Sequence, residues 1–180
     1  MIFEPFPDFL PSEYRVKFAT EAWERREAAA LRRQVFCNEQ RIFLADDRDA
    51  TDDVAIPIVA ISSFCVVTQE VVGTVRIHEA ERGVWWGSRL AVAADYRRIS
   101  ALGTSLIRLA VCSAHARGCK GFYAHVQSQN APLFHRLNWV TIEETELHGR
   151  PHHLMEADLS HYPPFADAEF GFLALPKKAA

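Results

Sequence analysis

Residues 84–117 join an apolar strand to an apolar helix through a loop that holds two arginines and several small residues. The strand is expected over residues 84–92 and the helix over residues 102–117, with YRRIS between them. Unpaired N–H groups at a helix start attract anions, the helix dipole adds positive potential, and small side chains let a phosphate approach the backbone. We therefore expect an anion site here, to which Arg97 and Arg98 add charge. The alternative is an ordinary helix start that follows two surface arginines.

The loop carries neither of two common nucleotide-binding signatures. The pattern GxxxxGK[ST] is absent, and so is GxGxxG. A P-loop and a dinucleotide-binding fingerprint are therefore excluded as the origin of the expected anion site.

The hydrophobic patterns of the whole chain predict a mixed α/β (α+β) domain in which strands outnumber helices. Strands are expected over residues 15–19, 58–68, 71–78, 84–92, 121–127, 140–147 and 153–159, and helices over 21–36, 102–117 and 131–137. A turn at Gln69 and Glu70 would join the second and third strands into a hairpin. This order predicts one mixed, mostly antiparallel sheet of about seven strands flanked by helices. At 180 residues we expect a single domain, with residues 160–180 as a C-terminal extension.

Composition excludes several classes of function. The net charge of -3 argues against broad nucleic-acid binding, which needs a basic face. No apolar run approaches the ~20 residues that cross a membrane, and the N-terminal residues lack the pattern of a secretory signal. The four cysteines have no CxxC spacing, which favours reduced thiols over disulfides or a zinc site. We therefore expect a cytoplasmic protein without a metal ion.

Three segments resemble the GNAT superfamily of acyl-CoA-dependent N-acyltransferases. Residues 98–103, RISALG, resemble the pyrophosphate-binding signature [Q/R]-x-x-G-x-[G/A], with Ala101 in place of its first glycine. The stretch QSQNAPLFHRLNW resembles a downstream family segment and keeps Asn130, Phe134, Leu137 and Trp139. The stretch GRPHHLMEADL resembles the closing hairpin of many members. The resemblance spans about residues 15–160 and implies the GNAT fold, an N-acyltransferase activity, and acetyl-CoA or another acyl-CoA as cosubstrate.

The resemblance also implies which residues hold the acyl-CoA. Backbone groups of the fourth strand would hold the pantetheine and polarise the thioester carbonyl, although LAV is also simply a buried strand. The implied cosubstrate-binding residues are Leu90, Ala91, Val92, Arg97, Arg98, Ser100, Ala101, Leu102, Gly103, Thr104, Asn130 and Phe134.

Proton transfer is less well defined by the sequence. The family's frequent general acid is a tyrosine at the position of Phe134, and phenylalanine cannot donate a proton. Glu39 and His125 are the leading candidates for acid or base, with His78 and His152 behind them, because an imidazole titrates near neutral pH. The alternatives are a hydrogen-bonded strand histidine for His125 and a cap or an ion pair with Arg41 for Glu39.

A narrower resemblance links the chain to the acyl-homoserine-lactone synthases within the GNAT superfamily. Those enzymes pair arginines with acidic residues near the acyl-acceptor site. The segments LRRQVFCNEQRIF, DDRD, VGTVRI and SRLAV place the corresponding residues at Arg32, Phe36, Asp46 or Asp47, Asp49, Arg76 and Arg89. The acidic residue that those enzymes carry three positions before the second arginine is Trp86 here. The chain as a whole also resembles a bacterial subgroup of N-acetyltransferases that suggests no firm substrate.

Arg76 and Arg89 have two roles that the sequence leaves open. They would bind a substrate carboxylate together, or each would be tied to Asp46, Asp47 or Asp49 to anchor the acidic loop, ADDRDATDD, at residues 45–53. Trp85 and Trp86 point to opposite faces of a strand, so at most one of them lines an acceptor pocket. The tail either packs over the sheet or contacts a second subunit of a homodimer.

These observations predict an N-acyltransferase that moves an acyl group, with acetyl as the first choice, from acyl-CoA to a small-molecule amine or amino-acid-like acceptor in a ternary complex. Arg76, Arg89 and Trp86 are the expected acceptor-binding residues. Two alternatives remain: a non-catalytic acyl-CoA-binding module, and an acyltransferase whose donor is an acyl carrier protein.

Overall fold

The computed structural model describes residues 13–64 and 68–174, and its described strands form one sheet. The order across the sheet is β6-β7-β5-β4-β3-β2-β1-β8. The strands are β1 Tyr14–Phe18, β2 Ile56–Phe64, β3 Thr68–Glu81, β4 Val84–Val92, β5 Gly121–Gln127, β6 Trp139–Leu147, β7 Arg150–Ala157 and β8 Phe172–Ala174. Neighbouring strands run antiparallel except β4 and β5, which are parallel.

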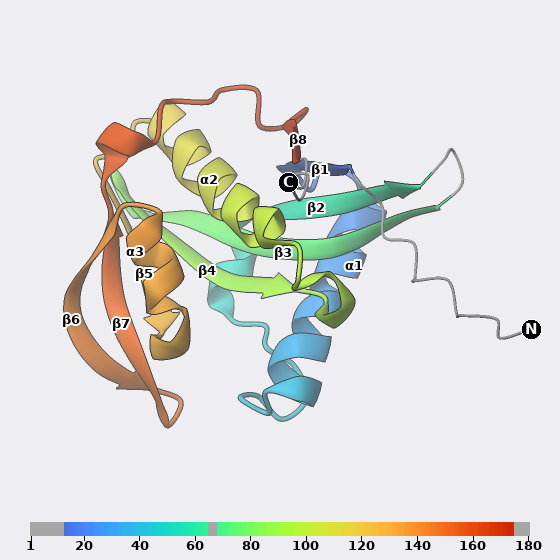
Figure 1. Ribbon diagram of the computed structural model, residues 1–180, viewed down its shortest axis with the longest axis horizontal. Helices are drawn as coiled ribbons and strands as arrows, with labels where there is room; N and C mark the ends of the chain where they lie inside the picture. The colour runs from blue at the N-terminus through green and yellow to red at the C-terminus, as the bar shows by residue number, and fades with distance from the viewer. Residues whose placement is uncertain (1–12, 65–67, 175–180) are drawn as a thin grey trace, which may run out of the picture.

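Helices cover both faces of the sheet (Figure 1). They are α1 Ala22–Arg33, which continues as the π-helical turn η1 Gln34–Glu39, α2 Ser100–Ala116 and α3 Ala131–Arg136, with short 3-10 turns η2 Ala50–Asp53, η4 Ala94–Tyr96, η5 Ser128–Asn130 and η6 Leu159–His161. Alternate residues of β2 point to the two faces, so that Ile58 packs in the core under α2, and Val59 packs in the core under α1. This second core also holds Leu31 and Phe36.

The sheet opens between β4 and β5. These two strands pair only over Val84–Trp86 and residues 121–123, and beyond this point they diverge. Gly87 lies where the pairing ends, and a Cβ on it would be 3.0 Å from Cε1 of Phe122. The absence of a side chain at Gly87 therefore lets the Phe122 ring fill the closed end of the opening.

A β-bulge bends β4 on the other side of this opening. The register with β3 changes from Thr74 opposite Ala91 to Arg76 opposite Ser88, so two residues of β4 face Val75 alone. One of the two, Arg89, has a φ of 56°, a left-handed conformation that is uncommon for a residue with a side chain. Beyond the bulge β4 pairs with β3 again, with Ala91 opposite Thr74 and Val92 opposite Gly73.

The C-terminal segment packs over α2 and extends the sheet. The backbone N–H of Phe165 donates to the Cys112 carbonyl of α2, at 3.0 Å, and that of Phe18 donates to the Ala168 carbonyl, at 2.8 Å. β8 then pairs with β1. Of the two roles left open for the tail, packing within its own chain is the one observed for residues 158–174.

Most of the elements predicted from the sequence are confirmed, with three corrections. The predicted turn at Gln69 and Glu70 is wrong, because β3 already begins at Thr68 and both residues lie within it. The predicted helix over residues 21–36 changes to π-helical geometry after Arg33. The sheet has eight strands rather than about seven, because the three-residue β8 is too short to show a hydrophobic period.

Three sequence-based expectations can be compared with the described residues. Cys37, Cys112 and Cys119 are free thiols, and Cys65 lies outside the described residues. No described helix is both long and apolar enough to cross a membrane. Within residues 13–64 and 68–174, no group of three or more His, Cys, Asp or Glu side chains is arranged to hold a metal ion.

Candidate active site

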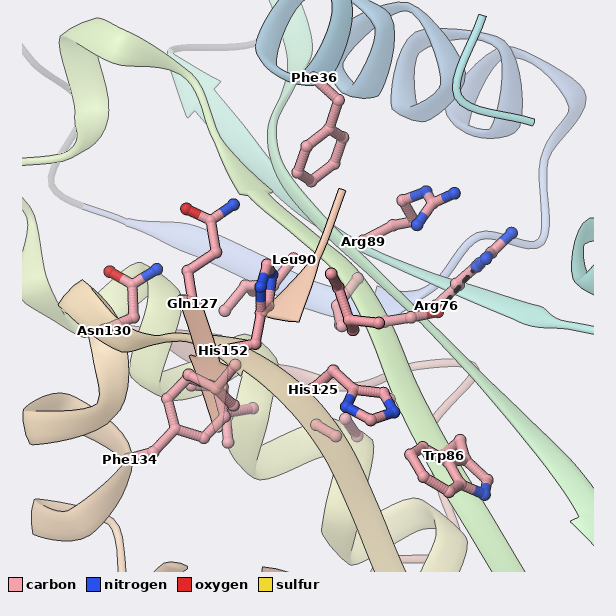
Figure 2. Close-up of a pocket in the computed structure, with 18 of the residues that line it drawn as sticks. Phe36, Arg76, Trp86, Arg89, Leu90, His125, Gln127, Asn130, Phe134 and His152 are labelled. Carbon is pink, nitrogen blue, oxygen red and sulfur yellow. Dashed lines mark hydrogen bonds between the residues drawn. The ribbon is translucent and has the colours of Figure 1, made fainter. Parts of the chain in front are cut away.

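A pocket of about 370 Å³ occupies the opening between β4 and β5 (Figure 2). Val126 and Gln127 of β5 and Leu90 of β4 line it where the strands have separated. From η1 and the following loop, Phe36 and Gln40 close it on the α1 side. Ten residues that the sequence analysis named for cosubstrate binding, proton transfer or the acceptor site line this one pocket: Phe36, Arg76, His78, Trp86, Arg89, Leu90, His125, Asn130, Phe134 and His152.

The start of α2 follows the open end of β4 and has the features of an anion site. Its N-cap residue, Ile99, makes no side-chain cap, and the first turn contains no acidic residue. A Cβ on Gly103 would meet nothing within 4 Å, so the surface above this turn is open. Leu102 is fully buried, and its backbone N–H already donates to the Ile99 carbonyl at 3.0 Å, so the free amides of this turn are those before it, at Ser100 and Ala101. Arg98 is exposed beside this turn.

Arg97 and Glu39 are tied to each other at the rim. Nε of Arg97 donates to the Val92 carbonyl at 3.0 Å, and Nη2 lies 2.5 Å from Oε2 of Glu39. Glu39 is not among the residues that line the pocket. This ion pair joins the end of η1 to the loop that leads into α2.

The acidic loop is held by three arginines. Arg32 bonds Asp47 through Nε at 2.7 Å and Asp52 through Nη1 at 2.5 Å. Arg76 binds both carboxylate oxygens of Asp49 at 2.8 Å. Its Nε donates to Ser88 at 2.9 Å, and its Nη1 lies 2.7 Å from Asp52. All three nitrogens of the buried Arg76 guanidinium therefore have partners in the protein, an arrangement that suits anchoring of the loop.

These contacts favour the charged forms of the aspartates. Burial opposes ionisation of Asp52, yet hydrogen bonds from Arg32, the backbone of Asp49 and Arg76 hold its pKa well below the ordinary value. The hydrogen bonds from Arg76 likewise lower the pKa of Asp49. The loop and its three arginines thus form a network of paired charges at neutral pH.

Arg89 is only partly used by this network. Its Nε donates to the Asp47 carboxylate at 3.0 Å, and its Nη2 donates to the Asp47 carbonyl at 2.9 Å and to Asp49 at 3.1 Å. Its guanidinium lies 4.6 Å from the centre of the Phe43 ring. Nη1 has no partner among the described residues, and Arg89 lines the pocket.

His152 is the most buried histidine of the pocket. Its side chain comes from β7, directly opposite Gln127 of β5, and the residue is only 7% exposed. Its Nδ1 lies 2.8 Å from the Arg150 carbonyl. Because a carbonyl oxygen can only accept, Nδ1 carries the hydrogen and Nε2 is left with a free lone pair in the neutral ring. In Figure 2 the imidazole lies near the middle of the residues drawn, beside Gln127.

His125 and His78 lie toward the closed end of the opening. His125 is exposed and stacks on Trp86, with ring centres 5.3 Å apart and planes at 26°. Desolvation lowers the pKa of His125, and His152 acts in the same direction. Desolvation followed by the charge of Arg76 lowers the pKa of His78, whose buried Nδ1 has no hydrogen-bond partner among the described residues.

Sequence reasoning named many of the pocket residues. It placed His152 behind Glu39 and His125, and it had no access to the contact of His152 with the Arg150 carbonyl, which forms beside the turn between β6 and β7. It also missed Gln40, whose side chain accepts a hydrogen bond from Gln127 at 3.0 Å across the pocket. A glutamine in an irregular segment after a helix carries no signal that would have indicated this contact.

Comparison with known proteins gives a family and a fold. A model of the acetyltransferase (GNAT) family matches residues 13–139. No curated protein sequence matches the chain. The fold is similar to that of a candidate N-acetyltransferase from Lactobacillus plantarum, with a TM-score of 0.69 and 22% identity, covering 80% of this chain and 97% of that one. Escherichia coli ElaA gives a TM-score of 0.66 and 19% identity, with coverage of 81% and 98%.

A third similar structure is a CoA-dependent acyl-homoserine lactone synthase, BjaI, with MTA. The TM-score is 0.66 at 15% identity, and the likeness covers 79% of this chain and 82% of that one. At such identities these three likenesses establish the fold, and the family model establishes the family.

Proposed function

Because this chain belongs to the acetyltransferase (GNAT) family and is an N-acyltransferase that uses acyl-CoA, we propose that it transfers the acetyl group of acetyl-CoA to a small amine or amino-acid-like acceptor, directly and in a ternary complex. The observation that carries the proposal is the pocket between β4 and β5, which is lined by Ile107 and Ala110 of α2, a helix whose start has no side-chain cap. The opening offers unpaired strand edges to a pantetheine, and the helix start offers amides to a diphosphate.

The proposed donor site runs from α2 into the opening. The amides of Ser100 and Ala101, which precede the first hydrogen bonds of α2, and the side chain of Arg98 bind the diphosphate, above the open surface of Gly103. The pantetheine lies along β4 beyond Trp86, where the β5 side of the strand has no ladder partner in the described sheet. This brings the thioester carbonyl to the backbone of Leu90, Ala91 and Val92, and Asn130 and Phe134 flank it. Leu90, Asn130 and Phe134 all line the pocket, so the proposed path of the pantetheine runs through it.

The proposed reaction begins with an ammonium acceptor. The Nε2 of His152 takes one proton, and the neutral amine attacks the thioester carbonyl to form the C–N bond. As the C–S bond breaks, the amine nitrogen loses a second proton, and the CoA thiolate takes a proton to leave as the thiol. The products are the amide and CoA, with one proton released. Phe134 has no hydroxyl, so protonated His152 is the proposed source of the thiolate proton.

Glu39 and His125 keep other proposed roles. The contact of Glu39 with Arg97 suits closure of the rim around bound CoA. The stacking of His125 on Trp86 suits a wall of the acceptor site. Arg76 would hold the acidic loop in place, since its guanidinium is fully bonded within the protein.

The test combines acetyl-CoA binding with turnover. Acetyl-CoA is expected to raise Tm, because a ligand that binds only the folded state stabilises it. Arg98→Glu is expected to remove this shift, and Arg108→Glu, at an exposed residue about two turns into α2, is the matched control. Release of free thiol with an amine establishes turnover. A protein whose Tm responds to neither acetyl-CoA nor longer acyl-CoAs would refute the proposal.

A second function is favoured by one observation, the missing hydroxyl at Phe134. A non-catalytic acyl-CoA-binding module would show the Tm shift but release no thiol with any amine. A carrier-protein donor would show thiol release with acyl carrier protein and none with acyl-CoA.

A further inference from the structure

We propose that the acceptor is an α-amino acid with an apolar or aromatic side chain, bound through its carboxylate by Arg89 and Ser88. This inference rests on the proposed function and adds the chemical class of the acceptor. Three properties of the pocket carry it: the charges of its lining, the hydrogen-bond donors that the protein leaves unused, and the aromatic groups beside them.

The charges exclude a polycationic acceptor. The lining includes the arginines Arg76 and Arg89 and four histidines, and no Asp or Glu of the described residues is among it. The acidic groups that contact the arginines of the lining, Asp47, Asp49 and Asp52, are already bound by arginines, and Glu143, which acts on His125, is not among the lining residues. A second ammonium group of a polyamine would therefore lie in the pocket without an anion, which is costly in a desolvated site.

Unused donors gather where β3 and β4 meet. Ser88 accepts a hydrogen bond from Nε of Arg76, so its own hydroxyl hydrogen is free to donate into the pocket. Nη1 of Arg89, the next residue, has no partner among the described residues. Both donors suit a carboxylate, since hydrogen bonds from a guanidinium to an ionised acceptor are the strong ones.

The orphan nitrogen of His78 supports the same location. His78 is two residues from Arg76 on β3, and successive even-numbered residues of a strand share a face. Its Nδ1 is buried and unpartnered, although buried polar atoms are normally satisfied. A polar group of a bound ligand in this part of the pocket would satisfy it.

The aromatic groups set the preferred side chain. Trp86 lies opposite His78 in the register of β3 and β4, and stacks on His125. Figure 2 shows both rings beside each other on one side of the pocket, away from Asn130 and Phe134. An apolar or aromatic side chain would pack against this pair while the amine points toward His152. A basic side chain in this pocket would be repelled by the positive charges of Arg76 and Arg89.

The experiment compares amino acids with their decarboxylated counterparts. Thiol release from saturating acetyl-CoA is measured with L-phenylalanine, phenethylamine, L-leucine, isopentylamine and spermidine. The expected kcat/KM is about tenfold or more higher for each amino acid than for its amine, and spermidine is the poorest acceptor. Ser88→Ala should lower the ratio of amino acid to amine about tenfold, mainly through KM for the amino acid. Ser63→Ala, on the exposed side of β2, is the matched control and should keep the ratio.

The outcomes separate this inference from the function on which it rests. If acetyl-CoA shifts Tm and the amines or spermidine react as well as the amino acids, only the acceptor class is refuted. If acetyl-CoA produces no shift, the proposed function itself fails. If acetyl-CoA binds but no compound releases thiol, calorimetry of L-phenylalanine with the CoA-saturated protein decides: binding that Ser88→Ala weakens supports the inference, and no binding overturns it.

Discussion

The Nδ1 atom of His152 lies 2.8 Å from the carbonyl oxygen of Arg150, two residues earlier on the same strand. This contact fixes the tautomer of a buried imidazole and directs the free lone pair of Nε2 away from the β6–β7 turn. Arg150 is itself held, because its Nη2 lies 2.5 Å from the Gln40 carbonyl of the opposite wall. The backbone carbonyl of Arg150 thus orients the ring that we propose as the base, and the side chain of Arg150 ties this backbone to the opposite wall.

The first prediction concerns this ring. His152→Gln is expected to lower kcat about 100-fold or more, because removal of a general base costs at least that in typical enzymes. The Tm shift with acetyl-CoA should remain, since the helix start is unchanged. Steady-state thiol release and thermal unfolding measure the two quantities.

Three controls accompany the His152 variant. His153→Gln changes the next residue, whose neighbours in the register face the other side of the sheet, and should keep kcat within about threefold. His125→Gln and Glu39→Gln test the two residues that the sequence ranked first. A loss of kcat in either of these that exceeds the loss in His152→Gln would contradict the assignment.

The second prediction separates helix stability from ligand binding at Gly103. A methyl group there meets no protein atom, so Gly103→Ala is expected to raise the free energy of unfolding by about 0.5–1 kcal/mol through helix propensity. The same methyl would stand over the amides of the first turn and should weaken CoA binding about tenfold by crowding the diphosphate. Chemical denaturation and calorimetry with CoA give the two values.

The converse change and a distant glycine test this reasoning. Ala101→Gly should lower the free energy of unfolding and strengthen CoA binding, because it removes a methyl from the same surface. Gly118→Ala, just beyond the other end of α2 at φ 87°, should destabilise the fold without changing the Kd of CoA. A Gly103→Ala protein with unchanged Kd would show that the diphosphate does not lie on this helix.

The sequence predicted the fold further than it predicted the site. Strong alternation and apolar runs located β4 and β5 to the residue, since each is flanked by clear turn signals. The bulge at Arg89 could not be predicted, because it arises from the register of β4 against β3 and places an arginine at positive φ. The partner of Arg76 could not be predicted either. The sequence was compatible with a substrate carboxylate or with the acidic loop, and the folded structure shows ion pairs with Asp49 and Asp52.

The third prediction uses the pH dependence of the acidic loop. Asp52→Asn is expected to lower the free energy of unfolding at pH 7 by about 2 kcal/mol, because charge-assisted bonds to Arg32 and Arg76 are lost. The pKa of Asp52 is lowered in the folded protein, so its contribution is complete above the ordinary aspartate pKa of ~3.9 and is lost as the pH falls through the folded value. The difference between wild type and variant should therefore be smaller at pH 3 than at pH 7.

Its neighbour provides the control for this measurement. Asp53 pairs with Arg48 at 2.9 Å, but both side chains are about two-thirds exposed, at 69% and 67%. Asp53→Asn should change the free energy of unfolding by no more than about 0.5 kcal/mol at either pH. Urea denaturation at the two pH values gives all the numbers. Equal effects of the two substitutions would mean that the loop is not held by Asp52.

The last prediction restores a hydroxyl where the family's general acid is expected. Phe134 is buried, lines the pocket and packs edge-to-face on Trp139 at 5.0 Å. Phe134→Tyr should raise kcat about tenfold, because a phenol near the departing sulfur can protonate the thiolate directly. His152 must first take that proton from the acceptor. The gain should come with a lower Tm, since the added hydroxyl is partly buried without a partner.

Phe165→Tyr, on the C-terminal segment outside the pocket lining, is the control for the added hydroxyl. If kcat in Phe134→Tyr stays at the wild-type value while acetyl-CoA still binds, proton delivery to sulfur does not limit turnover, and the absent phenol is no argument for a non-catalytic protein.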